Sequence, residues 1–114
     1  MKSGNDGVGA GRRRYCLASI RSAGGHEQAG HRPALVLSPL RYNEKRGMMI
    51  CCPMTSRIKG YAFEVVASRN PPSVILADQL KSIDWRARQA AKKGRVSAEI
   101  LADVQAKIRS LLGF

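Results

Sequence analysis

Short hydrophobic runs, separated by turn-forming residues, recur through the middle of the chain. The runs ALVLS (residues 34–38) and MMICC (48–52) are almost entirely apolar and each stops at a proline, so both predict buried strands. The run YAFEVVA (61–67) alternates in polarity, which predicts a strand with one wetter face. SVILADQL (73–80) predicts a fourth strand after the turn-forming SRNPP. Short strands at this spacing indicate a compact antiparallel sheet or small barrel.

Two polar segments connect or follow these predicted strands in the sequence. RYNEKRG (41–47) predicts a polar loop or a short helical turn that Gly47 closes. KSIDWRARQAAKKGRV (81–96) predicts a fifth strand, irregular and very basic, with a helical turn at its start as the alternative.

The end of the chain has a helical pattern. From Ser97, a residue type favoured at helix N-termini, apolar side chains recur at three- and four-residue spacing until Gly113, which suits a helix C-terminus. These apolar residues are Ile100, Leu101, Val104, Ile108, Leu111 and Leu112. A single amphipathic helix over one side of a curved antiparallel sheet makes an α+β domain.

Length and charge narrow the function. At 114 residues the chain is one domain with a modest core. Its net charge of +12 favours an anionic partner, most simply a nucleic acid, with a basic solvated surface as the alternative. Residues 27–114 alone carry fifteen basic and seven acidic side chains, so the charge belongs mainly to the body of the protein. Aromatic residues make up only 5% of the chain, which argues against an extended base-stacking platform.

Several classes of site and location are disfavoured. No run approaches the roughly 18 apolar residues of a membrane span, and no apolar secretory segment stands near the start. The cysteines (Cys16, Cys51, Cys52) are odd in number and lack CxxC spacing, which argues against a disulfide framework or a zinc site. Phosphate-binding GxxxxGK[ST] and nucleophile GxSxG motifs are absent. We therefore expect a cytoplasmic protein without a metal or other cofactor.

Polar side chains gather where one predicted strand begins and the next ends. They are Glu27, Gln28, His31 and Arg32 before the first strand, and Thr55, Ser56, Arg57 and Lys59 after the second. If these strands pair antiparallel, Arg32 and Thr55 meet at one edge of the sheet. Arginine grips phosphate oxygens at two points, and RNA carries its own 2′-hydroxyl nucleophile, so such a cluster could cleave RNA without a metal. The alternative is structural: Arg32 pairs with Glu27 on the surface, Thr55 ends a strand and His31 supports the fold.

Three strings in this order resemble the MazF/PemK family of toxin endoribonucleases from bacterial toxin–antitoxin pairs, and are most similar to its MazF branch. They are EQAGHRPALVLSP, YNEKRGMMICCPMTSRIKGYAFEV and LADQLKSIDWRARQAAKKGRVSAEIL, and the likeness spans about residues 25–113. The resemblance implies a PemK/CcdB-like fold, an SH3-like barrel of curved antiparallel sheet with a C-terminal helix. It also implies a homodimer, cleavage of single-stranded RNA at short sequences without a metal, and inhibition by a cognate MazE-like antitoxin whose disordered tail lies across the RNA site.

The resemblance also assigns roles to single residues. Arg32 in GHRP and Thr55 in PMTS match the family's catalytic arginine and threonine, and Glu27 in HEQAG matches the acidic residue at the edge of the site. The residues it assigns to RNA binding are Gln28, His31, Ser56, Lys59 and Arg86. For Arg86, in DWRAR, contact with the dimer partner is the alternative.

Residues 1–24 depart from the pattern that the resemblance implies. Where such proteins open with a hydrophobic strand, this chain has RRRYCLASIRSAG (12–24). Codons can be chosen for residues 13–24 that, read one base later, encode GDIVWLRFDPQA, which would suit the family's first strand. We therefore divide the chain into an atypical segment 1–24, encoded out of frame or disordered, and a toxin domain 25–114. The alternative is that YCLASI forms a makeshift strand.

Two other functions stay open at this point. One is an inactive family member that binds antitoxin or nucleic acid without cleavage. The other is a CcdB-like gyrase poison, because CcdB shares the fold, although the GHRP and PMTS motifs favour the ribonuclease.

Overall fold

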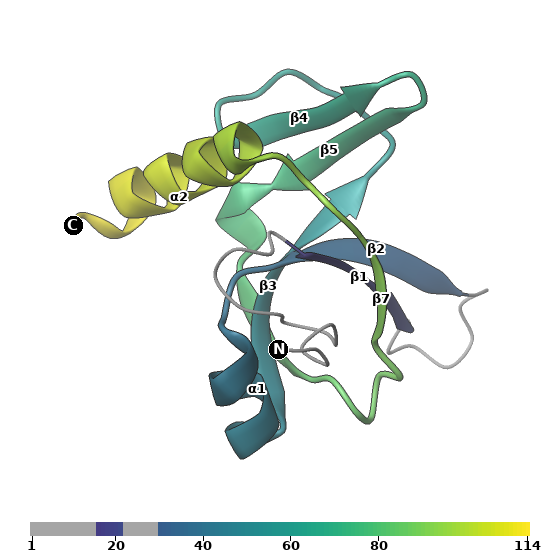
Figure 1. Ribbon diagram of the computed structural model, residues 1–114. Helices are drawn as coiled ribbons and strands as arrows, with labels where there is room; N and C mark the ends of the chain where they lie inside the picture. Colours follow the sequence, from purple (N-terminus) through teal and green to yellow (C-terminus); the bar gives the residue numbers. More distant parts are fainter. Residues whose placement is uncertain (1–15, 22–29) are drawn as a thin grey trace.

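One long central strand, residues 48–55, organises the sheet of this protein (Figure 1). The computed structural model describes residues 16–21 and 30–114. The elements are β1 (Cys16–Arg21), β2 (His31–Val36), α1 (Leu40–Arg46), β3 (Met48–Thr55), β4 (Glu64–Arg69), β5 (Pro72–Leu76), the 3-10 helix η1 (Ala77–Gln79), β6 (Lys81–Asp84), β7 (Ala91–Arg95) and α2 (Ala98–Leu112). The strands pair antiparallel in the order β4-β5-β3-β2-β1-β7, and β6 pairs with the first half of β3. This curled antiparallel sheet with a C-terminal helix confirms the predicted α+β class.

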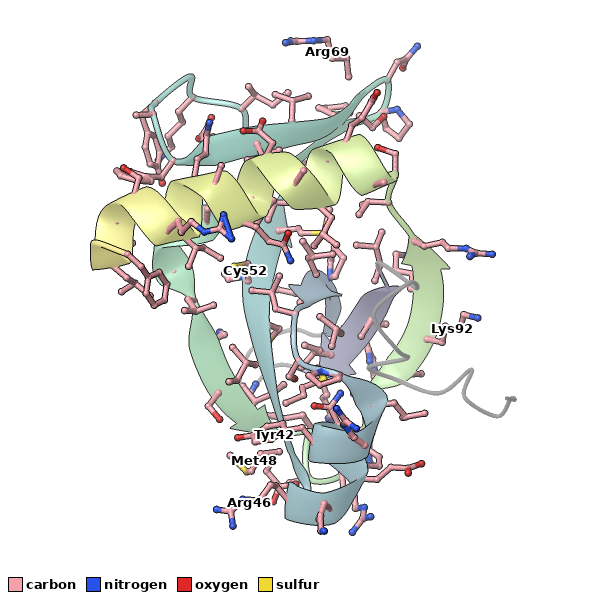
Figure 2. The ribbon with its side chains drawn as sticks, turned by 60° about the vertical axis from the view of Figure 1, so that its left-hand side comes forward. Tyr42, Arg46, Met48, Cys52, Arg69 and Lys92 are labelled. Carbon is pink, nitrogen blue, oxygen red and sulfur yellow. The ribbon has the colours of Figure 1, made fainter. Side chains whose placement is uncertain are left out.

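Both faces of the central strands are buried, which explains their almost unbroken apolar sequences. Val36 and Cys51 belong to one core, whereas Leu35 and Cys52 belong to a second core that includes Val104 of α2. Figure 2 shows α2 lying across the sheet next to Cys52. The predicted burial of the first two strands is therefore confirmed.

β3 continues through Pro53, so the prediction that this proline ends the strand was wrong. The carbonyl of Ile50 accepts the N–H of Leu37, which places the main-chain polar groups of Ile50 on the β2 side. Because these groups alternate between the two edges of a strand, the nitrogen of Pro53 faces the opposite edge. At that edge β5 ends next to Ile75, which is opposite Met54, and β6 begins at Lys81, which is opposite Cys51. The proline therefore lies in the gap between two strands, where a missing N–H breaks no ladder bond.

The third predicted strand begins later than its alternation indicated. β4 starts at Glu64, and Tyr61, which the alternation placed in the strand, precedes it with 41% of its surface exposed. The carboxylate of Glu64 accepts the main-chain N–H groups of Lys59 and Gly60, so the chain folds back on itself before the strand begins. A side chain that binds the preceding backbone thus overrides the local pattern.

The following segments also differ from the predicted strands. SVILADQL divides into β5, which ends at Leu76, and the short helix η1. The basic segment 81–96 contains two strands, β6 and β7, rather than one irregular strand. The side chain of Asp84 accepts the N–H groups of Arg86 and Ala87 at 3.1 and 3.0 Å, which turns the chain between the two strands.

Sequence signals mark the C-terminus of α1 and both ends of α2. Leu40–Arg46 is helical, which confirms the helical alternative for this segment, and Gly47 ends it with a φ of +70° and an N–H bond to the carbonyl of Asn43. In α2 the hydroxyl of Ser97 accepts the N–H of Ile100 at 3.1 Å, as predicted for an N-terminal cap. No helix in the described ranges is long and apolar enough to cross a membrane.

The first described residues, CLASIR, form β1 between β2 and β7. Ala18 is fully buried and Ile20 is 6% exposed, and both belong to the first core. The alternative that this segment forms a strand is confirmed. The proposed domain boundary at residue 24 lies outside the described residues, and the out-of-frame origin of the segment stays a prediction about the encoding DNA.

Candidate functional site

The start of β2 and the end of β3 meet, as their polar residues predicted. Ala34 pairs with Pro53, and continuing this antiparallel register by two residues brings Arg32 level with Thr55. Both residues line one cleft of about 320 Å³. Its lining residues are Gly30, His31, Arg32, Pro33, Met54, Thr55, Ser56, Pro72 and Ser73.

Three strands hold this cleft. Thr55 pairs with Val74 of β5, so the preceding residues Pro72 and Ser73 form the wall on that side. Met54 is 6% exposed and belongs to the second core, which fixes the backbone under the cleft. A polar cluster carried by packed strands keeps its geometry better than one carried by loops alone.

The two central side chains offer complementary chemistry. The hydroxyl oxygen of half-buried Thr55 accepts the N–H of Arg57 at 3.3 Å, which leaves its own proton available to a ligand. Arg32 is exposed, and within the described parts of the chain it forms no ion pair. In the part of the chain that the structure describes, the cleft therefore presents an exposed cation beside a neutral hydrogen-bond donor.

The other predicted site residues divide into three groups. His31 and Ser56 line the cleft with Arg32 and Thr55. Lys59 lies on the loop after β3, and Arg86 lies on the turn after β6 with its guanidinium 4.8 Å from the ring centroid of Trp85; neither residue lines the cleft. Glu27 and Gln28 lie outside the described residues.

Two buried thiols, Cys51 and Cys52, lie within β3 but are not nucleophiles. Burial raises the pKa of Cys51, although Lys81 and Arg88 oppose the shift. Burial, with smaller contributions from Cys51 and Asp78, raises the pKa of Cys52 to about 12. Both thiols therefore stay protonated at neutral pH.

Comparison with known proteins identifies the family. Residues 15–112 match the family described as "PemK-like, MazF-like toxin of type II toxin-antitoxin system". The chain belongs to this family. It is 59% identical over 90 residues to the endoribonuclease toxin MazF of Escherichia coli K12, covering 78% of this chain and 81% of that protein. It is 31% identical over 103 residues to the endoribonuclease PemK of Escherichia coli, covering 84% and 77%.

Solved structures agree with the sequence comparison. The crystal structure of MazF (Form-I) from Deinococcus radiodurans has a TM-score of 0.77 and 46% identity, covering 89% of this chain and 96% of that one. A MazE–MazF crystal structure (Form-II) from the same organism has a TM-score of 0.79 and 44% identity, covering 89% and 94%.

In this PemK/MazF-like chain the strand β1 adds a residue beside the cleft that the sequence analysis missed. Arg21 pairs with His31 in the antiparallel register, and its guanidinium donates to Oε1 of Gln89 at 3.2 Å. The main chain of Arg21 also donates to the carbonyl of Arg88 at 2.9 Å. Treating CLASIR as the partner strand of β2 would have placed Arg21 next to the GHRP motif.

Residue types that bind metals do not cluster in the part of the chain that the structure describes. Across residues 16–21 and 30–114, no three His, Cys, Asp or Glu side chains are close enough together to hold a metal ion. The chemistry that the described cleft itself offers comes from Arg32, Thr55, His31 and Ser56.

Proposed function

We propose that this chain is an endoribonuclease that cleaves single-stranded RNA without a metal ion and acts in the cytoplasm as the toxin of a toxin–antitoxin pair. The observation that supports this most is the cleft shared by Arg32 and Thr55. Its chemistry suits a phosphodiester because guanidinium and hydroxyl groups both donate to phosphate oxygens. The MazF and PemK relatives, named as endoribonucleases, point to the same reaction.

The proposed reaction uses the 2′-hydroxyl of RNA as the nucleophile. The 2′-oxygen attacks the adjacent phosphorus, the bond from phosphorus to the 5′-oxygen breaks, and the products carry a 2′,3′-cyclic phosphate and a 5′-hydroxyl. Arg32 stabilises the charge on the phosphorane oxygens, and Thr55 donates its proton to one of them. Glu27 accepts the proton of the 2′-hydroxyl, and the departing 5′-oxygen takes a proton from the guanidinium of Arg32. The proton held by Glu27 then returns to Arg32 through water, so both residues regain their starting states.

The remaining predicted residues have binding roles in this proposal. His31 and Ser56, which line the cleft, contact the RNA next to the reacting phosphate. Gln28, Lys59 and Arg86 are assigned to RNA contacts further along the strand. The net charge of +12 supports such contacts through phosphates.

The proposal includes two protein partners. A cognate MazE-like antitoxin is supported by the MazE–MazF crystal structures of the Deinococcus radiodurans relative. A homodimer is supported by large apolar side chains exposed where α2 ends, with Leu112 57% exposed and Phe114 80% exposed. A second copy would remove this apolar surface from water.

The test is cleavage of a long single-stranded RNA of mixed sequence in EDTA, with the ends of the products mapped. We expect discrete cuts with the wild type and a loss of at least a hundredfold in rate with Arg32→Ala. Arg46→Ala is the matched control, because Arg46 is an exposed arginine near the opposite end of β3, close to Met48 (Figure 2). Cuts that persist in Arg32→Ala, or a silent wild type, would contradict the proposal; antitoxin binding by a silent wild type would indicate an inactive binding protein.

A further inference from the structure

Glu64 is a buried carboxylate that the proposed reaction does not use. It begins β4 with 9% of its surface exposed. Its two oxygens accept the main-chain N–H of Lys59 at 3.1 and 3.2 Å, and one of them also accepts the N–H of Gly60 at 2.7 Å. A buried carboxylate with three such contacts holds its partners strongly, because hydrogen bonds to charged groups are shorter and stronger than neutral ones.

The partners of Glu64 form an anion-binding turn. Gly60 has a φ of +86°, in the left-handed region that favours glycine, and two successive N–H groups converge on one anion. Consecutive amide groups of this kind make a concave site for a negative charge. Here the negative charge is the protein's own, so the turn is fastened to the start of β4.

This turn connects directly to the cleft. The loop of residues 56–63 leaves β3 at Thr55, and the N–H of Arg57 donates to the hydroxyl oxygen of Thr55. Only Ile58 separates Arg57 from the anchored Lys59. Fixing Lys59 and Gly60 therefore also restrains Arg57, and with it the direction in which the Thr55 hydroxyl donates its proton.

We propose that Glu64 is a positioning residue for the cleft: its carboxylate anchors the loop after β3 so that Thr55 donates its proton into the cleft. The catalytic part of this inference rests on the proposed ribonuclease function. Glu64 itself touches no substrate, and it acts through the backbone of Lys59, Gly60 and Arg57.

The test compares three variants in single-turnover cleavage, using a short RNA oligonucleotide that spans the strongest cut mapped on a long RNA. Glu64→Ala removes the anchor, and we expect the rate at saturating protein to fall at least tenfold. Glu64→Gln keeps one amide oxygen that can accept both N–H groups, so its rate should stay within threefold of the wild type. Glu44→Ala removes an exposed carboxylate from α1 and serves as the charge-matched control with an unchanged rate.

Amide hydrogen exchange supplies a readout that does not depend on cleavage. In Glu64→Ala we expect the amides of Arg57 and Gly60 to exchange at least tenfold faster, while the amide of Leu37, bonded between β2 and β3, keeps its protection. A wild-type rate with protected loop amides would overturn the proposal. Slower cleavage in both Glu64→Ala and Glu64→Gln would also overturn it if the fraction of unfolded protein in each variant accounts for the whole loss of rate. If the wild type does not cleave RNA, the ribonuclease proposal fails, and exchange alone decides whether Glu64 anchors the loop.

Discussion

The indole N–H of Trp85 donates a hydrogen bond of 2.8 Å to the main-chain carbonyl of Asn43, and so fastens the turn after β6 to α1. Asn43 is fully buried, and its side chain accepts the hydroxyl proton of Ser38 at 2.6 Å. The same hydroxyl oxygen accepts the N–H of Ile50 at 2.9 Å. A buried polar network of this kind is expensive to break at any one member.

Replacing Trp85 by Phe should therefore destabilise the protein. The change removes the donor to the Asn43 carbonyl and some buried indole surface, and we expect the free energy of unfolding to fall by about 1–3 kcal/mol. Arg86→Ala, which removes only the cation above the ring, should cost at most about 1 kcal/mol. Urea unfolding measures the free energy of unfolding that each variant loses, and we expect the loss to be larger for Trp85→Phe. A larger loss for Arg86→Ala would contradict this prediction.

The strand β1 should contribute to the stability of the core. Ile20 is 6% exposed and packs in the first core, so Ile20→Ala should lower the free energy of unfolding by about 2–5 kcal/mol. Arg21→Ala, at the exposed end of the same strand, is the control and should change it by less than about 1 kcal/mol. An unchanged unfolding midpoint for Ile20→Ala would show that this segment does not pair in the sheet.

Much of this fold could be predicted from local sequence signals, because they agree with the tertiary structure. ALVLS and MMICC are buried on both faces, and Ser97 and Gly113 mark the ends of α2. Prediction failed where a strand pairing or a side-chain hydrogen bond that the hydrophobic pattern does not encode decides the outcome. Pro53 is tolerated only because two strands share one edge of β3, and Glu64 bends the backbone that precedes it.

Some parts of the candidate site could be predicted from the sequence and others could not, for the same physical reason. Arg32 and Thr55 could be placed together because antiparallel pairing follows from two neighbouring strands. The wall formed by Pro72 and Ser73 could not, because β5 reaches β3 across the loop and β4, and nothing in the local sequence specifies that register. Glu27 and Gln28 remain predictions.

Stability should decrease at alkaline pH through Cys52. The folded protein holds the pKa of this thiol at about 12, against 9.0 for an unperturbed thiol, so between these values the unfolded state loses the proton first. The stability that the protonated Cys52 thiol contributes is fully present below pH 9. Above pH 9 the free energy of unfolding falls by about 1.4 kcal/mol per pH unit through this group. Urea unfolding at pH 8 and pH 10.5 should show a steeper decrease for the wild type than for Cys52→Ala; equal slopes would contradict the assignment.

Self-association should depend on the end of α2. Leu112 is 57% exposed, and Leu112→Asp places a charge in the apolar surface that the proposed homodimer buries. We expect sedimentation equilibrium to give a dimer for the wild type and a monomer-enriched population for the variant. Ser110→Asp, an exposed polar position on the same helix, tests whether added charge alone has this effect. A monomeric wild type at micromolar concentration would contradict the proposal.

The central claim is that Arg32 and Thr55 act on one reacting phosphate. A double-mutant cycle of single-turnover RNA cleavage tests this most directly, with Arg32→Lys, which removes the two-point grip, and Thr55→Val, which removes the hydroxyl at nearly constant volume. Residues that stabilise the same transition state lose rate non-additively. We predict that the double variant cleaves within about tenfold of the slower single variant. Rate losses that multiply independently would show that the two side chains do not share one catalytic site.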